Sequence, residues 1–186
     1  MLKKFETKEL IFAALMGALM FVLSFAFGSV LNVALGNPSA SAFISTLIQP
    51  IIVVVALLII RKFGVATMMY FIYGVLAIPT NMMGGLPGPL KIVLALTMGL
   101  SFDIVTRVGK YNKISLFLGA IVIYLTSMPL LIYFYIKLGI PGADKFIAAA
   151  PILIAISVIE TFIGIFVGLY VYKKIQNKTI VRQISD

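Results

Sequence analysis

Six long apolar runs, separated by short polar or Gly/Pro-rich breaks, constrain this sequence more than any other feature. Of its 186 residues, 62% are hydrophobic and only 11% are charged, whereas a soluble domain carries about 25% charged residues. Most of the exterior must therefore face lipid. A membrane-spanning helix needs ~20 residues, so six helices leave no room for a soluble domain. We predict an all-α integral membrane bundle, one domain over residues 1–186, with six transmembrane helices at residues 10–33, 42–60, 65–79, 89–105, 114–136 and 147–172.

The distribution of Lys and Arg predicts the orientation. Twelve lie on one side of the predicted membrane, and the other side holds only Lys91, Lys137 and Lys145. Cytoplasmic loops of membrane proteins carry an excess of Lys and Arg, so both termini are expected in the cytoplasm of a multi-pass cell-membrane protein. This bias also explains the net charge of +9 without a nucleic-acid partner. The twelve are Lys3, Lys4, Lys8, Arg61, Lys62, Arg107, Lys110, Lys113, Lys173, Lys174, Lys178 and Arg182. The segment after Lys173 is expected to be a short, solvated tail.

The composition excludes several kinds of chemistry. There is no Cys and no His, which removes disulfides, thiolate catalysis, histidine metal sites and histidine proton relays. The carboxylates expected within the membrane, Asp103 and Glu160, are far apart along the chain, whereas membrane enzymes gather such groups at one interface. We therefore predict no enzyme activity, no catalytic residue, no metal and no cofactor.

The two longer outer loops carry hydrogen-bonding groups. Asn32 and Asn37 belong to the first, and Asn81 opens the second, which continues through several Gly and Pro residues to Lys91. Such a segment forms a tight turn, so it either serves as a plain helix hairpin or exposes groups to a ligand. Lys91 falls in the first turn of the fourth helix, where an anion is favoured. It would bind a ligand carboxylate or phosphate, or reach lipid headgroups.

Glu160 lies near the middle of the sixth predicted helix, where a carboxylate facing lipid is costly. It must face the bundle or a wet cavity, as a ligand-binding residue or as a structural partner. Gly164 and Gly168 follow at four-residue steps and allow a close helix neighbour on the same face. Asp103 precedes Arg107 by one turn, which predicts an ordinary ion pair.

Three further features are candidates for contact with a ligand or partner. Gln49, before Pro50, places an amide in the outer half of the second helix. Tyr124 on the fifth helix would stack on a flat ligand or belong to an interfacial tyrosine belt. Ala14 and Ala18 form a small-residue stripe on the first helix, beside a second stripe that includes Gly17, and such stripes permit close helix approach.

Together these residues resemble the substrate-binding S component of energy-coupling factor (ECF) transporters, the vitamin-uptake class. The resemblance covers nearly the whole chain, and the Ala-x-x-x-Ala motif of that family is matched at Ala14–Ala18. The segment from Gly85 to Lys91, followed by residues 99–103, is similar to the thiamine and hydroxymethylpyrimidine branch.

The resemblance implies a mechanism and partners. An S component captures a micronutrient from outside, docks on a membrane-embedded coupling protein through the first helix, and is driven by two cytoplasmic ATPases. On this basis the substrate-binding candidates are Asn32, Asn37, Gln49, Asn81, Lys91, Tyr124 and Glu160, and the docking residues are Ala14 and Ala18. The alternative is a small secondary transporter or channel working alone, in which Glu160 would be the coupling residue.

Overall fold

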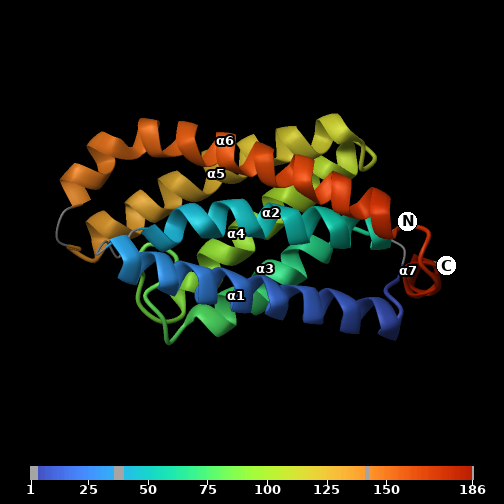
Figure 1. Ribbon diagram of the computed structural model, residues 1–186. Helices are drawn as coiled ribbons and strands as arrows, with labels where there is room; N and C mark the ends of the chain where they lie inside the picture. Colours follow the sequence, from blue (N-terminus) through green and yellow to red (C-terminus); the bar gives the residue numbers. More distant parts are fainter. Residues whose placement is uncertain (1–3, 36–39, 141–142, 186) are drawn as a thin grey trace.

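The computed structural model describes residues 4–35, 40–140 and 143–185, and within these ranges the only regular elements are helices (Figure 1). This confirms the all-helical prediction for the described residues. Six helices of 13 to 33 residues follow one another, and a seventh of 7 residues comes after them. Their bounds are α1 (Thr7–Leu35), α2 (Ala40–Ile60), α3 (Val65–Ala77), α4 (Leu90–Val108), α5 (Lys113–Lys137), α6 (Ala143–Ile175) and α7 (Thr179–Ser185).

The helices form an antiparallel bundle in which α2 is central. Figure 1 shows α1 and α6 along opposite sides with α2 between them, and α2 packs against both. Every residue of α2 from Ile52 to Ile60 is buried, which is what an apolar surface all round a helix predicts. The other half of the bundle is built by α3, α4 and α5, which pack in that order. The two ends of the chain lie at the same end of the bundle (Figure 1).

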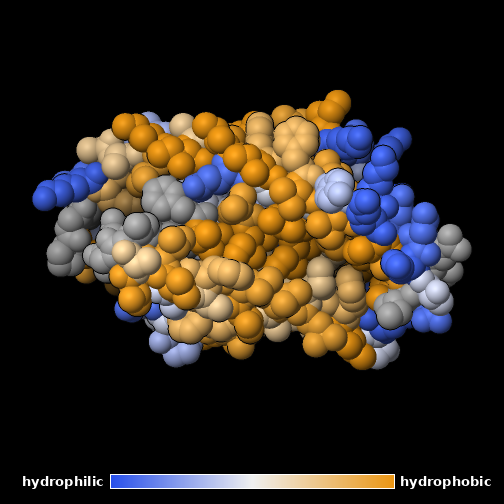
Figure 2. All heavy atoms as spheres, viewed as in Figure 1, coloured by the Kyte–Doolittle hydropathy of each residue, from blue (hydrophilic) through white to orange (hydrophobic). Residues whose placement is uncertain are grey.

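The outside of the bundle is apolar along its length. Figure 2 shows hydrophobic residues over the middle of one face and hydrophilic residues gathered at the ends, most of them at the end that holds the termini. Within the described residues, α1, α5 and α6 are long and apolar enough to cross a membrane, while α2 and α3 contribute shorter apolar segments. The count of six crossings therefore stays a prediction.

Helix α3 is short, and it is joined closely to α4. Its 13 residues give a length of about 20 Å, less than the ~30 Å of a bilayer core. A Cβ added at Gly99 of α4 would lie 2.6 Å from the Thr67 Cα, and one added at Gly74 of α3 would lie 2.8 Å from the Ala95 Cβ. Glycine is needed at both positions because the two backbones approach so closely.

Asp103 binds the start of α3 and does not pair with Arg107. Its side chain is fully buried; its carboxylate accepts hydrogen bonds from the amides of Ala66 (3.2 Å) and Thr67 (2.7 Å), and from the Thr67 hydroxyl (2.6 Å). Arg107 instead places its guanidinium 5.3 Å from the centre of the Phe63 ring. The ion pair predicted from the four-residue spacing is wrong, because the first-turn amides of α3 lack intrahelical partners and attract the carboxylate.

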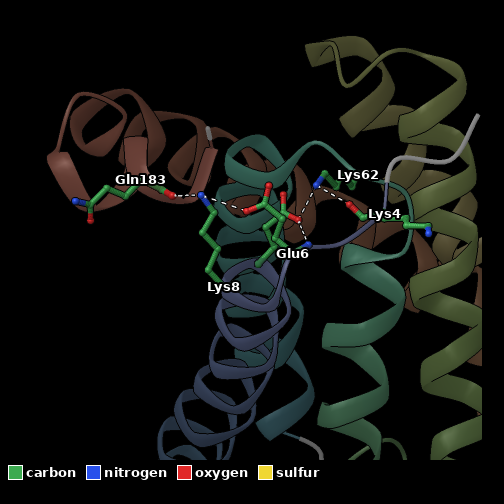
Figure 3. A network of polar contacts seen from close by, with 6 residues as sticks. Lys4, Glu6, Lys8, Lys62 and Gln183 are labelled. Atoms are coloured by element: carbon green, nitrogen blue, oxygen red, sulfur yellow. Dashed lines mark hydrogen bonds and ion pairs between the residues drawn. The ribbon is translucent and has the colours of Figure 1, made fainter.

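The chain after Lys173 is also more ordered than we predicted. Helix α6 continues to Ile175, and α7 follows, with Val181 and Ile184 packed against the hydrophobic core. Figure 3 shows the Lys8 side chain of α1 reaching toward Gln183 of α7, to whose backbone carbonyl its ammonium donates a hydrogen bond. The prediction of a solvated tail fails because apolar residues between the polar ones of α7 bury one face of this short helix.

A second contact at the same end ties α1 to the segment between α2 and α3. The Lys62 ammonium lies 2.6 Å from the Glu9 carboxylate and also donates to the Lys4 carbonyl (Figure 3). The same Glu9 carboxylate accepts from the Glu6 amide at 2.7 Å, as the glutamate of a capping box does at the third helical position. The start of α1 is thereby held to the rest of the bundle.

Candidate functional site

Close contact between α2 and α6 places Glu160 inside the bundle. A Cβ added at Gly164 would lie 2.6 Å from the Leu47 carbonyl oxygen, and one added at Gly168 would lie 2.9 Å from the Ile51 carbonyl oxygen. The predicted close neighbour of this face is therefore confirmed, and it is α2. Glu160, one turn before Gly164, lies on the same face and is half-buried.

Glu160 belongs to a small group of polar side chains contributed by three helices. Its carboxylate accepts a hydrogen bond from the Thr46 hydroxyl of α2. The next residue, Thr161, has its hydroxyl 2.7 Å from the Tyr124 hydroxyl of α5. Thr161 also donates to the Thr46 carbonyl at 3.4 Å. These contacts connect α2, α5 and α6 near the middle of α5 and α6.

A small cavity of about 10 Å³ adjoins this group. That volume matches a single water-sized sphere. Gln49 is buried and lines the cavity together with Tyr124, so the structure brings two sequence-predicted residues to one place. The lining residues are Thr46, Gln49, Pro50, Val53, Tyr70, Phe102, Ile123, Tyr124 and Thr161.

The polar group continues toward α1 through Tyr73 of α3. The Tyr73 hydroxyl lies beside the side chains of Ser45 and Gln49. Ser24 of α1 is fully buried near the same hydroxyl, yet its Oγ has no hydrogen bond of acceptable geometry within the described residues. Buried polar atoms are almost always hydrogen-bonded, so this hydroxyl has unused capacity to donate and accept.

The site is polar and carries one charged side chain. Within the described ranges, Glu160 has no Lys or Arg within ion-pair distance, since the two ion pairs found there, Lys8–Glu6 and Lys62–Glu9, lie at the end of the bundle that holds the termini. A carboxylate accepts hydrogen bonds and attracts cations, while hydroxyl groups and the Gln49 amide both donate and accept. The arrangement is suited to a small polar ligand with a cationic or hydrogen-bond-donating group beside Glu160.

Lys91 lies away from this group, at the far end of α3. It falls in the first turn of α4 as predicted, but its side chain is only 1% exposed, so it does not extend to the headgroup region. Its ammonium donates to the carbonyls of Ala77 (2.9 Å), Ile78 (3.4 Å) and Thr80. These carbonyls end α3, where a cation is favoured by the helix dipole. Its role with an anionic ligand stays a prediction.

The other predicted residues are not brought to the polar group. Asn81 is exposed on the loop between α3 and α4. The Asn32 side chain and all of Asn37 lie outside the described residues. On α1, Ala14 and Ala18 are half-buried. The neighbouring stripe packs against α3 within the bundle, because a Cβ added at Gly17 would lie 2.8 Å from the Met69 carbonyl oxygen. The docking role of the alanines stays a prediction.

Several members of the polar group were missed in the sequence. Thr46 lies one turn before Gln49, and Thr161 directly follows Glu160, so a search for hydroxyl residues beside the candidates would have found both. Tyr70 and Tyr73 share one face of α3 at a spacing of three. Ser24 gives no such signal, because a single serine in an apolar helix is common.

Comparison with known proteins finds a solved structure with the same fold and a family to which the sequence belongs. A solved structure described as an S-component of an ECF transporter has the same fold, with a TM-score of 0.67, 19% sequence identity, and coverage of 98% of this chain and 91% of that chain. Among curated proteins, none matches the sequence significantly. The family model described as "Hypothetical bacterial integral membrane protein (Trep_Strep)" matches residues 7–141. Because that match covers well over half of the sequence, the chain belongs to this family and is a multi-pass membrane protein.

Proposed function

We propose that this protein is the substrate-capture subunit of an ECF-type importer, binding a vitamin or related micronutrient at the extracellular side. In this proposal six helices cross the bilayer with both termini in the cytoplasm. A membrane-embedded coupling protein and two cytoplasmic ATPases drive uptake. The observation that carries the proposal is the polar group around Glu160, set inside a fold shared with a solved S-component.

The charge distribution supports the proposed orientation. The order of the helices brings the cations of the N-terminal segment, the α2–α3 and α4–α5 connections and the end of α6 to the end of the bundle that holds both termini (Figure 1). An excess of Lys and Arg on one side is typical of the cytoplasmic side. The loop between α3 and α4 lies at the opposite end, which would face the exterior.

Capture at this site requires the bundle to open. Ligand pockets for vitamin-sized molecules hold ~300–1,000 Å³, far more than the cavity of about 10 Å³ beside Gln49 and Tyr124. The polar group is closed by the α2–α6 contact and by α5. A ligand would enter as these helices separate at their outer ends, exchanging the internal hydrogen bonds of Thr46, Thr161 and Glu160 for bonds to itself.

The direct test is a binding screen of the purified protein against water-soluble vitamins and their precursors, thiamine and hydroxymethylpyrimidine included. A ligand at 100 times its Kd stabilises the native state by ~2.7 kcal/mol. For a protein of this size, that raises the melting temperature by about 5–11 °C. No shift with any member of the panel, from protein shown to be folded, would argue against capture of a vitamin.

Glu160→Gln tests the role of the carboxylate. The amide keeps the size of the side chain and can still accept from Thr46, so the fold is preserved while the charge is lost. We expect the affinity for a cationic ligand to fall more than tenfold. Asp144→Asn, at an exposed position near the start of α6, is the matched control and should leave affinity unchanged. Equal affinity in Glu160→Gln would remove this residue from the site.

The proposed docking face is tested by Ala14→Trp combined with Ala18→Trp. Two indole rings on this half-buried stripe would hold a partner helix away, so uptake in cells should be abolished while ligand binding to the purified protein is retained. Leu15→Trp is the control, because Leu15 is 64% exposed on the same helix and outside the stripe. Normal uptake in the double variant would show that the coupling protein docks elsewhere.

The same uptake assay separates a capture subunit from a transporter working alone. A capture subunit loses uptake when the ATPase partners are absent. A secondary transporter that uses Glu160 for coupling would instead keep uptake without ATPases and lose it when the proton or sodium gradient is collapsed. Glu160→Gln would then abolish uptake driven by the gradient.

A further inference from the structure

We propose that the connection between α4 and α5 forms a binding site for one anionic phospholipid. An apolar groove of about 290 Å³ runs between the end of α4 and the start of α5. It lies at the end of the bundle that holds both termini, far from the polar group around Glu160. The inference depends on the protein being embedded in a membrane and not on its transport role. The groove is lined by Ile104, Val105, Val108, Gly109, Asn112, Ile114, Ser115 and Leu118.

The groove matches the dimensions of a lipid at the membrane surface. Ile104 to Val108 on α4, and Ile114 to Leu118 on α5, each cover about one helical turn, or ~6 Å along the helix axis. The volume of about 290 Å³ is far larger than the ~10–15 Å³ that one water-sized sphere needs. This suits a glycerol backbone and the first methylene groups of an acyl chain, with the remaining chain lying along the apolar helices.

The walls of the groove are apolar and unusually exposed. Val108 is 79% exposed and Ile114 is 70% exposed, and both line the groove, one from the end of α4 and the other from the start of α5. Gly109 of the connection packs tightly against the Ser115 side chain of α5, since a Cβ added at Gly109 would overlap the Ser115 Cβ. This close approach of the end of α4 to the start of α5 depends on glycine at position 109.

Two lysines supply the positive charge at the rim. Lys110 and Lys113 adjoin the lining residues in the chain and are exposed, and neither ammonium group has a hydrogen-bond or ion-pair partner in the described parts of the protein. The nearest acidic residue along α4, Asp103, is buried against the start of α3 and offers no compensation. Basic clusters beside grooves between transmembrane helices bind anionic headgroups.

The start of α5 adds to the attraction for an anion. Asn112 accepts two hydrogen bonds from the first turn of α5. Its side-chain oxygen accepts from the Ser115 amide (2.7 Å), and its backbone carbonyl accepts from the Leu116 amide (3.3 Å). The amides of Lys113 and Ile114, also in the first turn, have no backbone or side-chain acceptor within the described residues. Such amides and the positive end of the helix dipole favour a phosphate, and a bound phosphate would also relieve the unfavourable position of Lys113 there.

The test is a lipid titration of the detergent-purified protein, read as bound-lipid adducts by native mass spectrometry. Dioleoylphosphatidylglycerol and dioleoylphosphatidylcholine carry the same acyl chains and differ in headgroup charge. Each lysine near a headgroup contributes a factor of about 5 in affinity, so one molecule of the anionic lipid should bind about 30-fold more tightly than the zwitterionic lipid. Equal binding of the two lipids, or binding without a single-site limit, would overturn the proposal.

Two double variants test whether the lysines beside the groove, and not the total positive charge, select the anionic lipid. Lys110→Gln with Lys113→Gln should remove most of the preference for the anionic lipid, while Lys173→Gln with Lys174→Gln, at the same end on α6, should leave the binding of both lipids unchanged. An equal loss in the two double variants would show attraction to total charge and no built site.

The groove itself is tested by Val108→Trp, which places an indole across it. Binding of both lipids should weaken by a similar factor. Val93→Trp is the control on the same helix, because Val93 is also exposed but lies near the other end of α4. Unchanged binding in Val108→Trp, or complete displacement of the lipid by glycerol phosphate, would show that the acyl chain does not occupy the groove.

Discussion

Asp103 offers the sharpest test of how α3 is held in the bundle. In Asp103→Ala, the amides of Ala66 and Thr67 and the Thr67 hydroxyl lose their acceptor in a fully buried place. Each buried group left unsatisfied costs ~1–3 kcal/mol. The loss is partly offset because a carboxylate no longer has to be desolvated. We expect the free energy of unfolding to fall by ~2–4 kcal/mol.

The assay is thermal unfolding of the purified protein in one detergent. For a chain of this length, 1 kcal/mol corresponds to about 2–4 °C, so the melting temperature of Asp103→Ala should fall by roughly 5–15 °C. Asp103→Asn keeps one acceptor oxygen and should show a smaller loss. Asp144→Asn removes a negative charge from an exposed position and should melt like the unmodified protein.

A double-mutant cycle distinguishes the hydrogen bonds from a general effect of the substitution. Thr67→Val removes the hydroxyl that donates to Asp103 at 2.6 Å. Groups in direct contact show coupling energies of ~0.5–3 kcal/mol, so the double variant Asp103→Asn, Thr67→Val should lose less than the sum of the two single losses. Strict additivity, or an Asp103→Ala variant as stable as the control, would refute the assignment of this carboxylate to the start of α3.

Two further predictions concern contacts at opposite ends of the bundle. Tyr135→Phe removes the hydroxyl that donates to the Gly84 carbonyl of the α3–α4 loop; amide hydrogen exchange at residues 81–88 should become faster, and unchanged exchange there would show that the tyrosine does not hold the loop. Glu9→Gln leaves the mostly buried Lys62 ammonium without its ion-pair partner, so the melting temperature should fall by several degrees. Glu6→Gln, whose side chain is more exposed, is the control, and an equal fall in both variants would contradict the importance of the buried pair.

The general architecture could be predicted from the sequence because hydrophobic patterning acts locally. Four of the predicted ranges lie within observed helices. The third passes the end of its helix by two residues, Ile78 and Pro79, and the fourth begins one residue before its helix, at Pro89. The spacing of Gly164 and Gly168 correctly indicated a close neighbour for α6. Small residues repeated every four positions lie on one face of a helix and let another backbone approach it. The identity of that neighbour depended on the tertiary fold.

The partners of the buried charges could not be predicted in this way. Local spacing paired Asp103 with Arg107, and the position of Lys91 near a loop placed it at the outer surface. Both instead bind backbone groups of a different helix, α3. Helix ends expose unpaired amides and carbonyls, but a sequence does not show which ends come within reach of which side chains.

The fastening of α3 at both ends by α4 has a consequence for the biogenesis of the protein. A segment of 13 residues is too short to span a bilayer alone, and short isolated helices gain little stability from their own hydrogen bonds. The ribosome synthesises α3 before Lys91 and Asp103 exist, so its final carbonyls and first amides have no partners when it first reaches the membrane. With six crossings, as proposed above, stable insertion of α3 waits for α4, and the two helices enter the bilayer as one hairpin.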